Sequence, residues 1–278
     1  MRTIFSFLTT IAICATLCSC YGNSDEDSTT TTYDVNGLIE IGPFVKGTTV
    51  TLQPLSDDLS DTGVSLSTTV SDNAGTFSFT SLGIDAGYAK ITIRGSYYNM
   101  FTDSVTKSTV SMKAISYLSG NTTINANFVT DLIAGRVTTL MNAGKTYYFA
   151  TQEAKTELMT IFGLQRYSST DFTKVSISTG SEDAAALIAI TALIEYNRTD
   201  LQVIEYLSKL NYEFSPNGTF STSTMEQIKS DRTNLKSQLT TIAQNLVKRY
   251  KTVNKTIEVL DLRPFFDFDS NGTAGDEK

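Results

Sequence analysis

The 278-residue chain contains 0 histidine and 0 tryptophan. Without histidine it can hold neither Ser-His-Asp nor Cys-His catalytic machinery, nor any histidine-ligated zinc or iron site. Without tryptophan it lacks the strongest side chain for stacking on sugars, although 13 tyrosines and 15 phenylalanines can substitute. Glycine-rich phosphate loops of the Walker or Rossmann type are also missing. A carboxylate pair remains the one hydrolytic arrangement open, and no acidic cluster in the sequence marks it. We therefore expect a protein that is not an enzyme.

Basic charge and cysteine are scarce as well. Lysine and arginine number 22 against 29 acidic residues, giving a formal net charge of -7. An acidic chain without a basic stripe is a poor nucleic-acid binder, so no nucleic-acid partner is expected. The 3 cysteines, Cys14, Cys18 and Cys20, all fall at the N-terminal end. The rest of the chain has no disulfide, and its stability must come from a hydrophobic core.

The N-terminal residues have the pattern of an export signal. Arg2 precedes an apolar run over residues 4–17, which is short of the roughly 20 residues of a membrane-spanning helix. The run ends in Leu17-Cys18-Ser19-Cys20, which resembles the lipobox of bacterial lipoproteins. The resemblance implies a signal peptide over residues 1–19, a diacylglycerol thioether on Cys20, and the lipid bilayer as a partner. The alternative is an ordinary signal peptide with incidental cysteines.

Residues 20–32 predict a disordered tether. Ser24-Asp25-Glu26-Asp27 is followed by a threonine tract, a composition that cannot bury apolar surface. An acidic cluster just after a lipidated cysteine also resembles the surface-export signal of Bacteroidota lipoproteins. That resemblance implies anchoring in the outer membrane with the body at the cell surface. The periplasmic face stays open as the alternative.

Residues 33–118 predict a β-sandwich. Apolar and polar residues alternate in short segments separated by turn-forming residues. In 64–71, for example, Val64, Leu66 and Val70 share one face. The expected strands are residues 48–55, 64–71, 76–79, 89–95 and 108–114.

The segments "VKGTTVTLQPL", "TTVSDNAGTFSFTSL" and "GYAKITIRG" resemble the carboxypeptidase-regulatory or transthyretin-like module. The Asp72–Gly75 turn matches its hairpin. The resemblance implies an Ig-like or transthyretin-like sandwich that works in scaffolding or adhesion. Phe77, Phe79 and Ile91 are expected in its core.

Residues 122–256 predict an α-helical bundle domain, because apolar residues recur at helical spacing. Gly144 and Gly163 are expected to end the first two helices. Ser181 and Asp200 are expected to cap the next two, and residues 223–250 are expected to form one long amphipathic helix. The predicted fold class is therefore α+β with segregated elements, a sandwich followed by a helical bundle.

Two motifs strengthen the resemblance to a group of Bacteroidota lipoproteins. They are "GPFVKG" at 42–47 and the Asn125-x-Asn127-x-x-Thr-Asp-Leu stretch. The resemblance carries no activity with it.

The C-terminal tail, residues 257–278, contains a possible calcium loop. The sequence D-x-D-x-N-G places oxygen ligands on alternate residues before a glycine, as hard cations require. The candidate ligands are Asp267, Asp269, Asn271, Thr273 and Asp276. The twelfth position is Lys278 rather than the bidentate glutamate, so a polar tail without metal is the alternative.

Three functions follow from these patterns. The leading one is a non-enzymatic surface lipoprotein in adhesion, envelope structure or assembly, with a protein or glycan partner. The second is a glycan- or peptide-binding accessory of an outer-membrane uptake system, with Tyr97-Tyr98 or Tyr147-Tyr148 as an exposed aromatic platform. Each pair is expected to alternate faces on a strand. The third is an enzyme with two facing carboxylates in a cleft.

Overall fold

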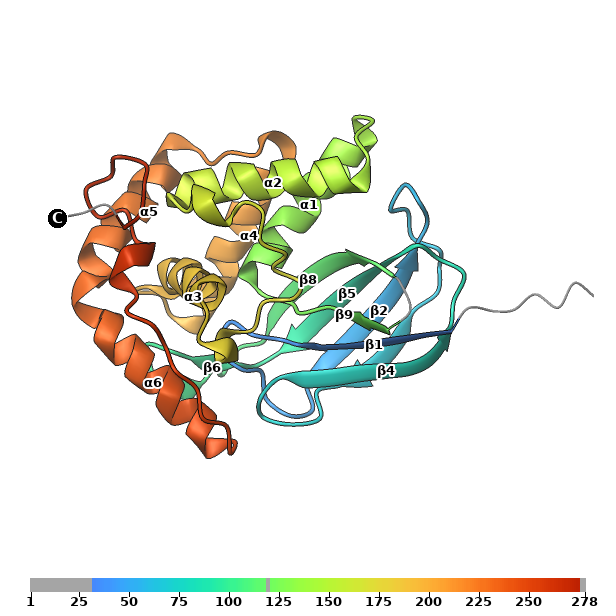
Figure 1. Cartoon of the computed structure of the whole chain (residues 1–278), viewed down its shortest axis with the longest axis horizontal. Coiled ribbons are helices and arrows are strands. Elements are labelled where there is room, and N and C mark those ends of the chain that lie inside the picture. Colours follow the sequence, from blue (N-terminus) through green and yellow to red (C-terminus); the bar gives the residue numbers. More distant parts are fainter. Residues whose placement is uncertain (1–31, 119–120, 276–278) are drawn as a thin grey trace, which may run out of the picture. The chain divides into compact units, whose positions relative to one another are not determined.

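The computed structural model describes residues 32–118 and 121–275 (Figure 1). Cys20, the acidic tether and Asp276 lie outside these residues. The described chain begins with strands and continues with helices. The strands are β1 (Thr32–Leu38), β2 (Thr49–Leu55), β3 (Leu66–Thr69), β4 (Thr76–Gly83), β5 (Tyr88–Gly95), β6 (Tyr98–Asn99), β7 (Ser104–Val105), β8 (Val110–Tyr117) and β9 (Asn121–Thr123). The fold is therefore α+β.

The strands form three sheets. An antiparallel four-stranded sheet has the order β3-β2-β5-β8, and a three-stranded sheet has the order β4-β1-β9 with β1 and β9 parallel. Strands β6 and β7 form a separate pair. The five predicted strands are β2, β3, β4, β5 and β8. The prediction for Val64 was wrong, because β3 begins at Leu66 and the Val64 side chain is 45% exposed.

The turn between β3 and β4 explains the D-x-x-G sequence. The Asp72 carboxylate accepts hydrogen bonds from the backbone N–H groups of Ala74 and Thr76, at 2.9 and 3.0 Å. Gly75 adopts a φ of 84°, and a Cβ there would lie 2.5 Å from the carbonyl oxygen of Ile39. Both the conformation and the space require glycine. Phe77 and Phe79 follow the turn and are buried, as predicted.

The helices are α1 (Phe128–Asn142), α2 (Tyr147–Phe162), α3 (Glu182–Glu195), α4 (Asp200–Asn217), α5 (Thr222–Leu235) and α6 (Leu239–Thr252). The predicted caps at Ser181 and Gly163 are confirmed. Two other cap predictions were off by one residue: α1 ends with Ala143 as its C-cap, and Thr199 rather than Asp200 caps α4.

The single long helix predicted over residues 223–250 was wrong. A 3-10 turn at Lys236–Gln238 divides it into α5 and α6. Helix α6 contacts residues that lie far back in the chain. Asn245 Nδ2 donates a hydrogen bond to the carbonyl of Met100 at 2.8 Å, and the Tyr98 hydroxyl donates to the Asn245 carbonyl at 3.2 Å. Packing against residues far back in the chain thus overrides a continuous helical pattern.

The Asn125-x-Asn127 motif joins the sheets to the helices. Asn125 Oδ1 accepts from the backbone of Leu38 in β1, and its Nδ2 donates to the Val175 carbonyl, both at 2.9 Å. Asn127 caps α1 in a capping box with Thr130. Both asparagines are buried, and their bonds cross elements that are distant in sequence. The hydrogen bonds of the two asparagines therefore give this motif a structural role in the fold.

The described residues, 32–118 and 121–275, group as one compact unit. One core cluster extends from strand residues such as Val35 to Ala274 near the C-terminus. The segment after residue 256 is part of this body, because Phe265, Phe266 and Asp267 are buried. Among the described helices, none combines the length and apolar character needed to cross a membrane.

Candidate functional site: a tyrosine-lined pocket

A pocket of about 620 Å³ lies among the ends of β5 and β8, helices α1 and α2, and the segment 169–174. Its volume is in the range of small-molecule binding sites. Four tyrosines line it: Tyr88, Tyr117, Tyr147 and Tyr148. Aliphatic side chains from β8 and α1 add apolar surface, namely Ile115, Ile133, Ala134 and Val137. Aromatic walls with a limited set of polar groups are typical of ligand pockets.

Strand register brings the first two tyrosines together. Tyr88 starts β5 and Tyr117 ends β8, and the antiparallel pairing sets them opposite each other. Their ring centroids are 5.5 Å apart. Tyr147, in the first turn of α2, places its ring 4.8 Å from that of Tyr88 and donates its hydroxyl hydrogen to the Ile115 carbonyl at 2.9 Å. Burial raises the pKa of the Tyr147 hydroxyl, so it stays protonated.

Two of the tyrosine rings face solvent. Tyr117 is 55% exposed and Tyr148 is 65% exposed. The next residue, Phe149, is also exposed, with its ring centroid 5.4 Å from that of Tyr148. Tyr88 and Tyr147 are half-buried. The pocket therefore has an inner aromatic wall and exposed rings that a ligand can stack on.

The segment 169–174 forms the opposite wall and is fixed by hydrogen bonds, one of them buried. Asn127 Nδ2 donates to the Phe172 carbonyl at 2.9 Å, and the Phe172 side chain is buried. The Asp171 carboxylate accepts from the backbone and hydroxyl of Thr173 at 3.0 and 2.6 Å. These bonds hold the wall in place before any ligand arrives.

Lys155 is the buried charge of the pocket. Its side chain extends from α2, and the residue is 4% exposed. The ammonium donates to the carbonyls of Thr170 and Ser169 at 2.9 and 3.4 Å. Burial lowers the pKa of Lys155, and the nearby Asp171 carboxylate opposes that shift. Lys174, exposed at the rim, donates to the carbonyl of Thr123.

The two predicted aromatic platforms have opposite outcomes. Tyr97 and Tyr98 are 2% and 3% exposed, so that pair was wrongly predicted as a platform. Helix α6 lies against Tyr98, and its Arg249 guanidinium is 5.3 Å from the centre of the Tyr98 ring. The Tyr97 ring packs on that of Phe44, with the centroids 5.6 Å apart. Tyr147 and Tyr148 do line the pocket, but they lie on a helix and not on the strand that was expected.

Sequence reasoning missed Tyr88, Tyr117 and Lys155. A signal for Lys155 exists: it lies three residues before Leu158 and directly after Ala154, on the apolar stripe of its helix. A charged residue at such a position is seldom buried without a reason. No comparable signal marks the two tyrosines, because strand register and not sequence spacing brings them together.

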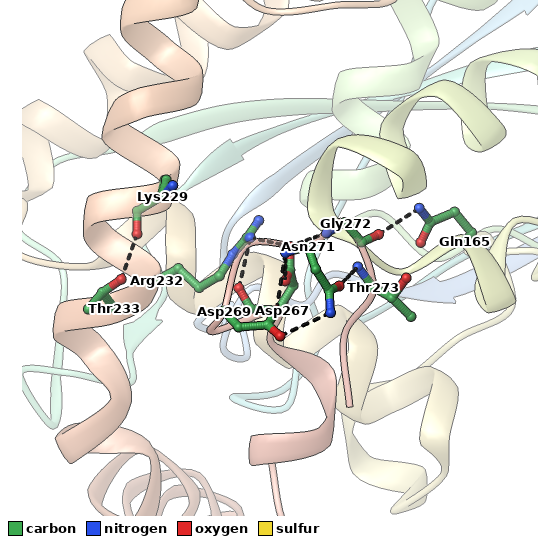
Figure 2. A network of polar contacts seen from close by, with 9 residues as sticks. All are labelled: Gln165, Lys229, Arg232, Thr233, Asp267, Asp269, Asn271, Gly272 and Thr273. Atoms are coloured by element: carbon green, nitrogen blue, oxygen red, sulfur yellow. Dashed lines mark hydrogen bonds and ion pairs between the residues drawn. The ribbon is translucent and has the colours of Figure 1, made fainter. Parts of the chain in front are cut away.

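The predicted calcium loop is a folded turn bound to α5 (Figure 2). Asp267 is buried, and its Oδ2 accepts from Nη1 of Arg232 at 2.8 Å. The same carboxylate accepts from the backbone N–H groups of Asn271 and Gly272 at 3.0 and 3.1 Å. Farther along, Gly272 accepts a hydrogen bond from the Gln165 side chain at 2.8 Å.

The described carboxylate and amide oxygens of this turn already accept hydrogen bonds from groups of the protein. The Arg232 guanidinium already supplies the positive charge beside Asp267. Asp269 Oδ2 accepts from the Asn271 amide nitrogen, and Asn271 Oδ1 accepts from the Thr273 backbone at 2.9 Å, so both oxygens are used within the turn. Across the described part of the chain, acidic side chains do not gather in threes to hold a metal ion. Asp276 lies outside that part.

The carboxylate pair that an acid-base enzyme requires is not found in this pocket. Asp171 is the one acid among its described lining residues. Two other carboxylates, Glu40 and Glu195, are fully buried in the core, and burial raises the pKa of each. Glu40 accepts hydrogen bonds from the Tyr250 hydroxyl and the Ile177 backbone, and Glu195 lies beside Tyr97. Neither lines the pocket.

Comparison with protein-family models, with curated proteins and with solved structures finds no match to this chain.

Proposed function

We propose that the chain is a non-enzymatic lipoprotein, anchored in the bacterial outer membrane through Cys20, that binds a small ligand in the tyrosine-lined pocket. The observation that carries the binding function is the cluster of Tyr88, Tyr147 and Tyr148 around a 620 Å³ cavity. The anchor rests on the Leu17-Cys18-Ser19-Cys20 sequence. The ligand class is the glycan or peptide of an uptake system.

Three properties of the pocket support binding. Its aromatic rings are held by a sheet and a helix, so little order has to be created when a ligand enters. Its opposite wall is fixed through Asn127 and Phe172. The exposed ring of Tyr148 keeps apolar surface in contact with water, which is unfavourable, and a ligand that covers the ring removes that contact. Core packing alone does not require an exposed ring at this position.

We also propose that the two larger sheets form a transthyretin-like sandwich that serves as the scaffold of the site. Buried Val50, Leu52 and Ile91 on the four-stranded sheet and Phe77 on the three-stranded sheet support this assignment. A second candidate function is adhesion or envelope assembly without a small ligand. The exposed rings of Tyr148 and Phe149 favour it, because adjacent exposed aromatics also suit a protein partner.

A saccharide and peptide array tests the binding function. The full chain, purified in detergent, is applied as wild type, as Tyr148→Ala and as Tyr212→Ala. Tyr212 is the matched control because it is 83% exposed on α4 and does not line the pocket. We expect wild type and Tyr212→Ala to bind the same compounds, and Tyr148→Ala to bind about tenfold more weakly, as loss of one stacking contact implies. Equal binding by all three, or no binding at all, contradicts the proposal.

Protease treatment of intact cells tests the anchor and its orientation. The native chain should sediment with membranes and be digested from outside while a periplasmic marker survives. Cys20→Ala should release the chain from the membrane fraction. A wild-type body that is digested only after the outer membrane is opened would place it on the periplasmic side and contradict surface exposure.

A further inference from the structure

Lys155 carries a buried positive charge without an acidic partner at ion-pair distance. The ion pairs of the described residues involve other cations, such as Arg136, Arg198 and Arg232, and none includes Lys155. Carbonyl oxygens of the 169–174 wall accept two of its hydrogens. Burying an ammonium that has carbonyl partners but no carboxylate at ion-pair distance is costly, and most buried charges are paired.

The pocket gives this charge a place to be neutralised. Lys155 and Lys174 line the pocket together with a single carboxylate, that of Asp171. One carboxylate oxygen of Asp171, Oδ1, already accepts hydrogen bonds from the backbone N–H and the hydroxyl of Thr173 in the same turn. In a chain with a net charge of -7, a pocket lined by two ammonium groups and one carboxylate attracts anions locally.

The remaining polar lining suits hydroxyl groups. Hydroxyl and amide side chains surround the aromatic rings, among them Ser116, Thr146, Thr151 and Gln152. Such side chains both donate and accept hydrogen bonds, as sugar hydroxyls do. The exposed rings of Tyr117 and Tyr148 offer flat faces at the same site. A peptide carboxylate would use the lysine alone, whereas a saccharide also brings hydroxyl groups that match this polar lining.

From this combination we infer that the pocket binds an anionic saccharide, with the sugar ring on the tyrosines and its acidic group at Lys155. The inference rests on the proposed binding function and adds the ligand class to it. The acidic group can be a carboxylate, as on a uronic acid, or a sulfate ester. Both place oxygen atoms that accept hydrogen bonds from the ammonium.

Matched probes test the charge requirement. Binding of the full chain in detergent is measured alongside the array for two matched pairs. The first pair is oligogalacturonate and its neutral methyl ester, and the second is a sulfated galactose oligomer and the same oligomer without sulfate. We expect one of the two anionic probes to bind at least tenfold more tightly than its neutral counterpart. The anionic probe that binds more tightly identifies the acidic group of the ligand as a carboxylate or a sulfate ester. If neither anionic probe binds more tightly than its neutral counterpart, the inference is overturned and the proposed function still stands.

Variants of Lys155 test its role at the site. Lys155→Met removes the charge and keeps the length of the side chain, while Lys155→Arg keeps the charge. Lys229→Met is the matched control, because Lys229 is exposed on α5 outside this pocket. We expect Lys155→Met to lose the preference for the anionic probe, Lys155→Arg to recover most of it, and Lys229→Met to leave it unchanged. A preference that survives in a folded Lys155→Met protein overturns the inference. If no saccharide on the array binds, the proposed glycan-binding function fails first.

Discussion

The C-terminal turn gives a prediction whose size follows from burial. Arg232 and Asp267 are 5% and 3% exposed, and their side chains are joined at 2.8 Å. Arg232 Nη1 also donates to the Asp267 carbonyl at 2.9 Å. Asp267→Asn keeps the volume of the side chain and removes the negative charge that faces the buried Arg232 guanidinium. Breaking a buried pair on one side costs about 3–5 kcal/mol.

Urea unfolding followed by circular dichroism measures this cost. With a slope m of about 3 kcal/mol/M for a chain of this size, the midpoint should fall by roughly 1 M or more, with m unchanged. Asp261→Asn is the control, because the Asp261–Arg263 pair is exposed, with side chains 50% and 70% accessible. It should leave the midpoint where it is, since exposed pairs contribute little. A midpoint for Asp267→Asn equal to that of Asp261→Asn would refute the reasoning.

Three further predictions follow. Burial raises the pKa of the Asp131 carboxyl to about 6, so ionising it destabilises the folded state. This destabilisation is absent well below pH 4 and grows as the pH rises, so between pH 4.5 and 8 the wild type should lose about 2 kcal/mol of unfolding free energy relative to Asp131→Asn in urea titrations. The same pH dependence of stability in both proteins would contradict this. Gly75→Ala should destabilise the chain by about 2 kcal/mol more than Gly63→Ala, because both glycines have positive φ and only Gly75 is crowded by Ile39; equal melting temperatures would contradict this. Calcium added after chelation should leave the urea midpoint of the full chain unchanged, because Arg232 already supplies the positive charge at Asp267. A rise of the midpoint with calcium would contradict this and support a calcium site in the turn.

The parts of the fold that local sequence determines were predictable. The turn from Asp72 to Gly75 has side-chain and φ requirements that only a few residue types meet, so its sequence predicted it. Ser181 caps the start of α3 and Gly163 caps the end of α2, both through contacts with residues close in sequence. Buried α3 was predicted from its apolar composition. In each case the energy that fixes the feature comes from residues a few positions away.

The parts that distant contacts determine were not predictable. The spacing of apolar residues is helical on both sides of residues 236–238. Periodicity therefore could not show the 3-10 turn there or the contact of α6 with Met100. Tyr97 and Tyr98 were predicted as an aromatic platform, and contacts with distant residues bury them: Phe44 for Tyr97, and Asn245 and Arg249 of α6 for Tyr98. Half of the tyrosine cluster depends on the pairing of β5 with β8. The candidate site was therefore visible in the sequence only through Tyr147 and Tyr148.

The central claim is that a ligand binds among the tyrosines, and methyl NMR tests it most directly. The full chain with labelled isoleucine and valine methyl groups is titrated with the strongest saccharide from the array. We predict shifts concentrated at Ile115, Ile133 and Val137, which line the pocket, with Ile228 and Ile242 on α5 and α6 unchanged. Shifts confined to the distant isoleucines, or spread evenly over the chain, would contradict the account.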